Sequence, residues 1–188
     1  MYSKFGQFID GKWTSSEKQE TYEVVNPATE EIIGKASKAG SEDVKKALNS
    51  GEKGFALWKK TAPWERSSII RKIADLMRKK NEILAKWLTL EVGKPLTESR
   101  AEVNTAADIF EWNSEETKRI YGQTVESRFA NTRIHVYYQP VGVVAALVPW
   151  NFPIVLAARK ISTALAAGCS VICKPDVIAP GGVMEMMN

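Results

Sequence analysis

Two polar side chains in the last quarter of the sequence have the types and positions that chemistry at a ligand would need. Asn151 stands in a short loop flanked by two prolines, and Lys174 directly follows the apolar run Ser170–Cys173. A side-chain amide can donate to an oxygen on which negative charge develops, and an ammonium can meet a ribose hydroxyl or a phosphate. The prolines restrict the chain direction, so the amide could be aimed at little entropic cost. Spacing alone also allows Asn151 to be a structural turn residue.

A strand, a helix and a second strand are predicted to position these two residues. The run Val141–Val148 is apolar and rich in β-branched residues, as in a parallel strand that is covered on both faces. A helix is expected from Phe152 and Pro153, with Gly168 as its stop, before the second strand Ser170–Cys173. The carboxyl ends of parallel strands joined in this way open at one edge of the sheet, where open α/β sheets bind their ligands.

The preceding part of the sequence divides into two β units, three helices and a strand. Asp10-Gly11 and Asn26–Thr29 are turn sequences between short alternating runs. From Ser41 the apolar period becomes helical, and we expect helices that begin with caps at Ser41, Thr61 and Thr97 and end near Lys60, Gly93 and Gly122. The tryptophans on these helices are expected to be core residues. Residues 124–139 return to a period of two, which predicts a strand with two unlike faces.

Composition excludes several classes of function. The apolar fraction is 44% and the charged fraction 26%, and no apolar run approaches the ~18 residues of a membrane span. No targeting segment is recognised, so we expect a cytoplasmic protein. The net charge of +4 comes from basic residues interleaved with acidic ones, as in Glu98–Glu102, which favours a solvated helix face over a nucleic-acid surface. A single histidine, His135, gives no support for a metal site, and Cys169 and Cys173 are expected to be reduced and buried.

The sequence resembles the aldehyde dehydrogenase superfamily. Pro149-Trp150-Asn151-Phe152-Pro153, Ala164–Cys169 and Lys174-Pro175 are similar in order and spacing to the signature of that family. Earlier segments agree with it, namely Phe8–Trp13, Val25–Thr29, Glu65-Arg66, Thr89–Leu96 and Pro140–Val143. The resemblance, which extends to about Pro180, implies an α/β fold: the start of a Rossmann-like parallel sheet with flanking helices, plus small antiparallel β elements. It divides the chain into an amino-terminal part of the cofactor-binding domain (1–123), a bridging and oligomerisation segment (124–139), a first βαβ unit (140–175) and a divergent tail (176–188).

The resemblance also implies residue roles in the oxidation of a small aldehyde to a carboxylic acid with NAD or NADP. Asn151 matches the asparagine whose amide donates to the oxygen of the thiohemiacetal, and Lys174 matches the lysine that holds the adenosine ribose. The backbone of Val148, Pro149 and Trp150 would line the cofactor. Arg159 occupies a place where relatives acting on succinate semialdehyde or lactaldehyde often carry arginine, and a guanidinium there could pair with a substrate carboxylate. The alternative is a surface arginine on a helix.

The sequence departs from the family near its end. In the family, the glycine-rich phosphate loop, the glutamate base and the nucleophilic cysteine lie beyond the matched segment, and neither Cys169 nor Cys173 matches that cysteine. We therefore expect a truncated enzyme that is inactive alone and binds the cofactor weakly or not at all. Val177 stands where the family has an acidic residue, and Gly181-Gly182 begin a stretch where the family starts a helix. These departures suggest a foreign tail from an interrupted or frame-shifted gene.

Two alternatives to a truncated dehydrogenase stay open. The chain could be a non-catalytic module that binds a nucleotide, or a full-length homologue through residues 124–139. It could also be half of a split enzyme that a separate chain completes. In each case a parallel sheet of two strands would expose an apolar edge, which predicts self-association or poor solubility.

Overall fold

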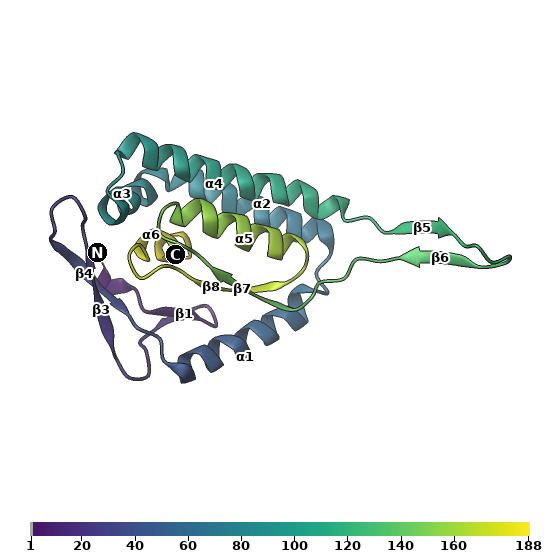
Figure 1. Cartoon of the computed structure of the whole chain (residues 1–188), viewed down its shortest axis with the longest axis horizontal. Helices are drawn as coiled ribbons and strands as arrows, with labels where there is room; N and C mark the ends of the chain where they lie inside the picture. Colours follow the sequence, from purple (N-terminus) through teal and green to yellow (C-terminus); the bar gives the residue numbers. More distant parts are fainter. Residues whose placement is uncertain (1) are drawn as a thin grey trace.

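The computed structural model describes residues 2–188, so residue 1 of the expected segment 1–123 lies outside the described residues (Figure 1). The strands are β1 (Gln7–Ile9), β2 (Lys12–Thr14), β3 (Thr21–Val25), β4 (Ile32–Ser37), β5 (Gln123–Glu126), β6 (Arg133–Val136), β7 (Val143–Leu147) and β8 (Ser170–Lys174). The helices are α1 (Ser41–Trp58), α2 (Pro63–Lys79), α3 (Asn81–Val92), α4 (Leu96–Glu116), α5 (Pro153–Ala166) and α6 (Gly181–Met186), with 3-10 turns η1 (Tyr2–Lys4) and η2 (Thr117–Arg119). The strands pair two by two, and only β7 and β8 among these pairs run parallel.

The two predicted amino-terminal β units are confirmed as the hairpins β1–β2 and β3–β4. Asp10 and Gly11 have φ values of 51° and 74°, so both central residues of the first turn are left-handed, as a tight two-residue hairpin turn requires. In the second turn, the Asn26 side chain accepts a hydrogen bond of 2.9 Å from the Ala28 N–H. Local turn chemistry therefore decides both hairpins.

The predicted βαβ unit is also confirmed, with β7 and β8 paired in parallel and α5 between them in the sequence. In Figure 1, α5 lies on one side of this pair and α1 on the other. Helix α1 comes so close that a Cβ on Gly51 would stand 2.9 Å from the Val143 side chain. The cover on the α1 side is incomplete, because Ala145 and Leu147, which share the face of Val143, are exposed. The expectation that both faces of this strand are covered therefore holds only in part.

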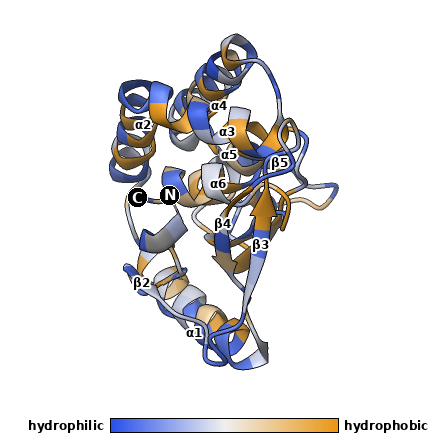
Figure 2. Cartoon of the chain, turned by 90° about the vertical axis from the view of Figure 1, so that its left-hand side faces the viewer, coloured by the Kyte–Doolittle hydropathy of each residue, from blue (hydrophilic) through white to orange (hydrophobic). Residues whose placement is uncertain are grey.

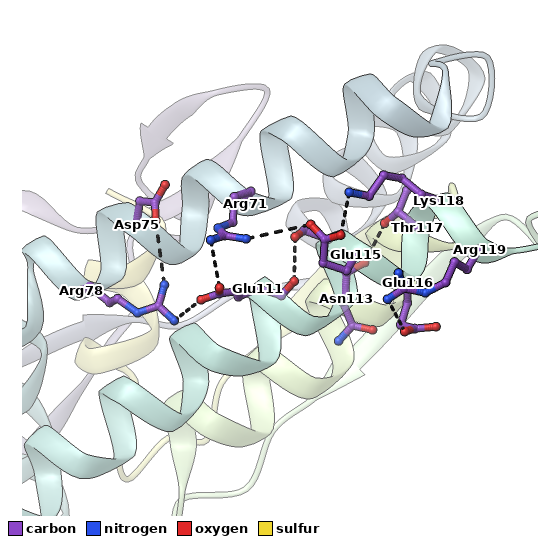
Figure 3. Close-up of polar contacts among 11 residues, drawn as sticks. Arg71, Asp75, Arg78, Glu111, Asn113, Glu115, Glu116, Thr117, Lys118 and Arg119 are labelled. Atoms are coloured by element: carbon purple, nitrogen blue, oxygen red, sulfur yellow. Dashed lines mark hydrogen bonds and ion pairs between the residues drawn. The ribbon is translucent and has the colours of Figure 1, made fainter.

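The main core lies between α5, α4, α2 and α3, and ion pairs line its outer rim. Buried apolar residues come from each of these helices, with Ile70 on α2, Leu88 on α3, Phe110 on α4 and Ile154 on α5 among them. Figure 2 shows hydrophilic and hydrophobic residues together on α2 and on α4, as in amphipathic helices that share a core. Figure 3 shows Arg71 and Arg78 of α2 reaching Glu111 of α4. Such exposed pairs each contribute at most about 1 kcal/mol, so burial of the apolar faces holds these helices together.

The predicted second helix is wrong in extent, because two helices occupy its place. Helix α2 ends at Lys79 and α3 begins at Asn81, with Lys80 between them at φ −96° and ψ 12°. The Asn81 side chain donates to the Arg100 carbonyl (3.1 Å) and to Asn104 (2.8 Å) on α4. The sequence did not indicate this break, because the apolar stripe continues through it. The contacts of Asn81 that fix it are made with α4.

The expected caps at Ser41, Thr61 and Thr97 are wrong by one or two residues, since Gly40, Ala62 and Pro95 take the cap positions. For α1 the reason is visible: the Asp43 carboxylate accepts from the Gly40 N–H at 3.0 Å and from the Glu17 N–H at 3.1 Å. A side chain in the first turn thus binds the N–H of the cap residue, which is one half of a capping box and not the contact expected of Ser41. The tryptophan prediction holds for buried Trp87, whereas Trp64 and Trp112 are largely exposed.

Residues 124–139 form the hairpin β5–β6 and not one strand with two unlike faces. Both strands are exposed along their whole length, and the hairpin projects from the body of the molecule as an arm (Figure 1). His135 lies on this arm, exposed, with its ring nitrogen 3.2 Å from the Thr124 hydroxyl. The segment Ser127–Thr132 between β5 and β6 contains no glycine or proline, so the sequence carried no strong turn signal there.

The expectation of an irregular tail after residue 175 is wrong, because Gly181–Met186 form helix α6 and pack into the core. The N–H groups of Gly181 and Gly182 donate to the Glu91 carboxylate at 2.6 and 3.0 Å. A Cβ on Gly181 would stand 2.4 Å from the Trp87 ring, so this contact requires glycine. The low helix propensity of glycine is offset here by close packing and by a buried carboxylate at the helix start.

Gly181→Ala is expected to lower the free energy of unfolding by about 1–3 kcal/mol, because the new methyl group overlaps the Trp87 ring. Urea unfolding followed by tryptophan fluorescence measures this loss. The matched control is Gly182→Ala, whose Cβ would meet its nearest atom, on Ile154, at 3.4 Å. The control should change stability by less than about 1 kcal/mol. Equal losses in the two variants would contradict the packing argument.

The stability of the chain is expected to fall as the pH rises from about 4.3 to about 7. Burial raises the pKa of the Glu91 carboxyl to about 7 although Tyr2, Gly182 and Gly181 donate hydrogen bonds to it. An unfolded glutamate titrates near pH 4.3, so between these values the folded state holds the extra proton and unfolding becomes easier as the pH increases. The loss is up to about 4 kcal/mol, from roughly 2.7 pKa units at ~1.4 kcal/mol per unit. Urea titrations from pH 4 to 8 should show this slope in the parent chain and a flatter profile in Glu91→Gln.

Candidate functional site

The carboxyl ends of β7 and β8 bring the two predicted site residues to one edge of the sheet. Leu147 pairs with Lys174 in the parallel register, and the Val148 N–H donates to the Lys174 carbonyl at 3.1 Å. The loop that carries Asn151 therefore starts beside the residue that ends β8. The prediction that Asn151 and Lys174 share an edge is confirmed, whereas their roles stay predictions.

The loop between β7 and α5 presents its middle to solvent and buries its ends. Val148 and Pro153 are buried, whereas Trp150, Asn151 and Phe152 are exposed. Pro153 is the first residue of α5, a position where the missing N–H costs nothing. The Asn151 carbonyl accepts a hydrogen bond of 3.2 Å from the Lys94 ammonium, so its backbone is tied inward while its side-chain amide is free to meet a ligand.

A buried carboxylate lies beneath this loop. Glu102 of α4 is 4% exposed, and its Oε1 accepts from the N–H groups of Ile154 and Val155 at 3.1 and 3.3 Å. The second oxygen of Glu102 pairs with Lys94. The interpretation of Glu98–Glu102 as a solvated helix face is therefore wrong for Glu102. Local charge alternation could not reveal its burial, because the α5 N–H groups that it binds lie 52 and 53 residues further along the chain.

The other half of the site is the loop that follows β8. The Lys174 side chain is exposed, and its ammonium donates to the Pro175 carbonyl at 3.3 Å. Asp176 turns back on its own loop and accepts from the Ile178 N–H at 3.0 Å. Both loops also expose large apolar side chains, namely Leu147, Trp150, Phe152, Val177 and Ile178. An ammonium and an amide beside apolar surface suit a ligand with a flat ring and hydroxyl or phosphate groups.

Arg159 lies apart from these two loops, in the seventh position of α5. It is exposed beside exposed Lys160, and its carbonyl accepts from the Thr163 hydroxyl at 2.7 Å. No contact in the described part of the chain joins its guanidinium to Asn151 or Lys174. Both interpretations of Arg159, as a partner for a carboxylate and as a surface arginine, stay open on this geometry.

The two thiols are at least partly buried. Cys169 is buried in the turn before β8, and Cys173 is partly buried within β8. Burial raises the pKa of the Cys173 thiol to about 11, and Lys160 lowers it only in part. Among residues 2–188 there is also no group of three or more His, Cys, Asp or Glu side chains that could hold a metal ion.

The chain belongs to the aldehyde dehydrogenase family, whose model matches residues 13–188. It is 42% identical over 179 residues to the glutarate-semialdehyde dehydrogenase of Pseudomonas aeruginosa, and 40% identical over 178 residues to the NADP-dependent succinate-semialdehyde dehydrogenase of Escherichia coli. These alignments cover 95% of this chain but 37% of each relative. The chain thus spans about 37% of the length of the curated relatives it matches.

Solved structures agree with this assignment. The crystal structure of succinate-semialdehyde dehydrogenase from Burkholderia pseudomallei superposes with a TM-score of 0.94 at 39% identity, covering 97% of this chain and 38% of the other. Betaine aldehyde dehydrogenase from Staphylococcus aureus, solved in complex with NAD+, gives 0.92 at 32% identity and covers 96% and 36%. The family match runs through residue 188, so a foreign tail after residue 175 is not supported. Within the described residues, no helix is both long and apolar enough to cross a bilayer.

Alkylation of Cys173 by iodoacetamide at pH 8 is expected to be roughly 100-fold slower in the folded chain than in urea, because a pKa of about 11 leaves little thiolate. Peptide mass spectrometry after timed quenching reports the two cysteines separately. Buried Cys169 should be protected as well. A folded-state rate similar to that in urea at either cysteine would show a thiol that folding does not protect and would contradict this description.

Proposed function

We propose that this chain supplies the oxyanion-side and ribose-side parts of an NAD(P)-dependent aldehyde dehydrogenase that oxidises a semialdehyde to a carboxylic acid. The observation that carries the proposal is the joining of the two site loops by the hydrogen bond from the Val148 N–H to the Lys174 carbonyl. This bond sets a side-chain amide and an ammonium at one edge of a parallel sheet. In a family of aldehyde dehydrogenases, that pair fits a carbonyl substrate next to a nucleotide.

The residues of this edge fit a dinucleotide. The Lys174 ammonium is exposed and can bind ribose hydroxyls, while the backbone of Val148, Pro149 and Trp150 would line the same ligand. The cofactor, when bound, accepts the hydride from the substrate. Val177 stands where the family has an acidic residue, and its side chain has no acceptor for a ribose hydroxyl. In this chain Lys174 would therefore hold the ribose without a neighbouring carboxylate. We infer that affinity of this chain alone for NAD or NADP is weak.

We assign Asn151 the role of an oxyanion donor. Its side-chain amide is exposed while its carbonyl is held by Lys94. In the complete enzyme, the amide would donate to the substrate oxygen as a cysteine outside this chain adds to the aldehyde carbon. Such a donor stabilises charge that develops in the transition state and is already oriented before the reaction begins.

The proposed substrate class and assembly rest on two further features. The names of the relatives specify glutarate and succinate semialdehydes, which carry a carboxylate that the Arg159 guanidinium could bind. The arm β5–β6 exposes Val125, Ile134 and Val136 on an unsupported two-stranded ribbon. Because such ribbons are marginally stable alone, we infer that the arm, residues 124–139, pairs with another copy in a homo-oligomer. Residues 1–123 and 140–175 then form one cofactor-binding domain.

A chimera tests the proposed function. This chain replaces the matching segment of the Escherichia coli succinate-semialdehyde dehydrogenase, and oxidation of succinate semialdehyde is followed by NADPH absorbance. We expect Asn151→Ala to lower kcat by about 100- to 1,000-fold with little change in KM for the cofactor. Lys174→Met should instead raise the KM for the cofactor.

Two further measurements test the role of Arg159 and the activity of the isolated chain. Arg159→Met should raise the KM for succinate semialdehyde but not for butanal, which lacks the carboxylate. The 188-residue polypeptide alone should show no turnover, because the family's nucleophilic cysteine and glutamate base are not in it. Turnover by this polypeptide alone, or full kcat in Asn151→Ala, would overturn the proposal.

A further inference from the structure

Lys94 is the point at which three groups around the Asn151 loop meet. Its ammonium pairs with Glu102, donates to the Asn151 carbonyl at 3.2 Å and lies 4.1 Å from the centre of the Phe152 ring. The side chain is 10% exposed although it ends in a charge. A lysine held this way has lost most of its conformational freedom, so its contacts are fixed in place.

The loop has little else to hold its middle. In the described part of the chain, residues 149–151 make no backbone–backbone hydrogen bond, and the nearest ones are those of Val148 before them and of Phe152 after them. Prolines at 149 and 153 offer no N–H at all. The Lys94 ammonium therefore supplies the direct polar tie to the Asn151 backbone, and its contact with the Phe152 ring adds a cation–π attraction next to it.

Glu102 fixes Lys94 in turn. Its carboxylate is almost fully buried, and one oxygen accepts the first N–H groups of α5 while the other pairs with the ammonium. A buried carboxylate with these partners is held in one geometry, since leaving either set of partners would expose an uncompensated charge to the core. The Lys94 ammonium is thus held in a fixed position beneath the Asn151 loop.

We propose that Lys94 is a positioning residue that orients Asn151 by holding its carbonyl. With the carbonyl tied inward, the side-chain amide stays directed outward and need not be ordered when a substrate oxygen arrives. The inference rests on the function proposed for Asn151. A purely structural alternative is that Lys94 serves only to neutralise Glu102 beneath α5.

Nuclear magnetic resonance of the 15N- and 13C-labelled 188-residue chain separates the two. In the parent, the backbone order parameters of Trp150 and Asn151 should be about 0.85, the value of rigid backbone. In Lys94→Met they should fall below about 0.6 and the Asn151 carbonyl 13C shift should move. Exchange of the Ile154 and Val155 amides should change less than about twofold, because Glu102 still accepts from them. Lys94→Arg should restore the order parameters.

Two further variants keep the test decisive. Lys59→Met is the matched control, since Lys59 also stands over a ring, that of Phe55 at 5.0 Å, but touches neither loop. It should leave Trp150 and Asn151 ordered. Glu102→Gln keeps an oxygen for the α5 amides and removes the ion pair, so it should loosen Asn151 as Lys94→Met does, and it decides the matter if Lys94→Met does not fold.

An ordered Asn151 in the variant that lacks the Lys94 ammonium or its ion pair would overturn the proposal. So would loosening of Asn151 only together with faster exchange at Ile154 and Val155, which would show the structural role alone. These signals need neither cofactor nor substrate. A failure here is therefore distinct from a failure of the proposed function, which the chimera reports through Asn151→Ala.

Discussion

Two buried carboxylates on neighbouring helices hold the starts of two other helices, and the arrangement of the site depends on this. Glu102 of α4 accepts the first N–H groups of α5, and Glu91 of α3 accepts those of α6. Helix α5 follows β7, and α6 follows β8. Each loop of the candidate site therefore begins at a strand of the parallel pair and ends at a helix. The first backbone N–H groups of that helix, which have no partner within the helix, bind a buried carboxylate.

The two carboxylates differ in how their charge is compensated. Glu102 has the Lys94 ammonium beside it, whereas the described contacts of Glu91 are hydrogen-bond donors without a full charge, from Tyr2, Gly181 and Gly182. Desolvation of an ion is costly, and partial charges at a helix start offset only some of that cost. This difference explains why burial raises the pKa of Glu91 towards neutrality. The same pattern of packing thus serves an ion pair at one loop and a carboxyl with a raised pKa at the other.

Sequence patterns predicted those parts of the fold that residues close together in the chain determine. The hairpin at Asp10-Gly11, the turn at Asn26 and the strand–helix–strand unit after residue 140 follow from local turn chemistry and apolar period, and they placed Asn151 and Lys174 at one edge. The break at Lys80, the burial of Glu102 and helix α6 depend on partners between roughly 20 and 90 residues away. A glutamate within a charged helix looks solvated until its helix is packed. Two glycines look unhelical until a tryptophan ring requires the space.

The hydrogen bond between the Val148 N–H and the Lys174 carbonyl makes the two loops mechanically dependent. A ligand that displaced the end of β8 would also displace the start of the neighbouring loop. The roles proposed for Lys174 and Asn151 would therefore be coupled through this one hydrogen bond, so that a change at either loop would reach the other.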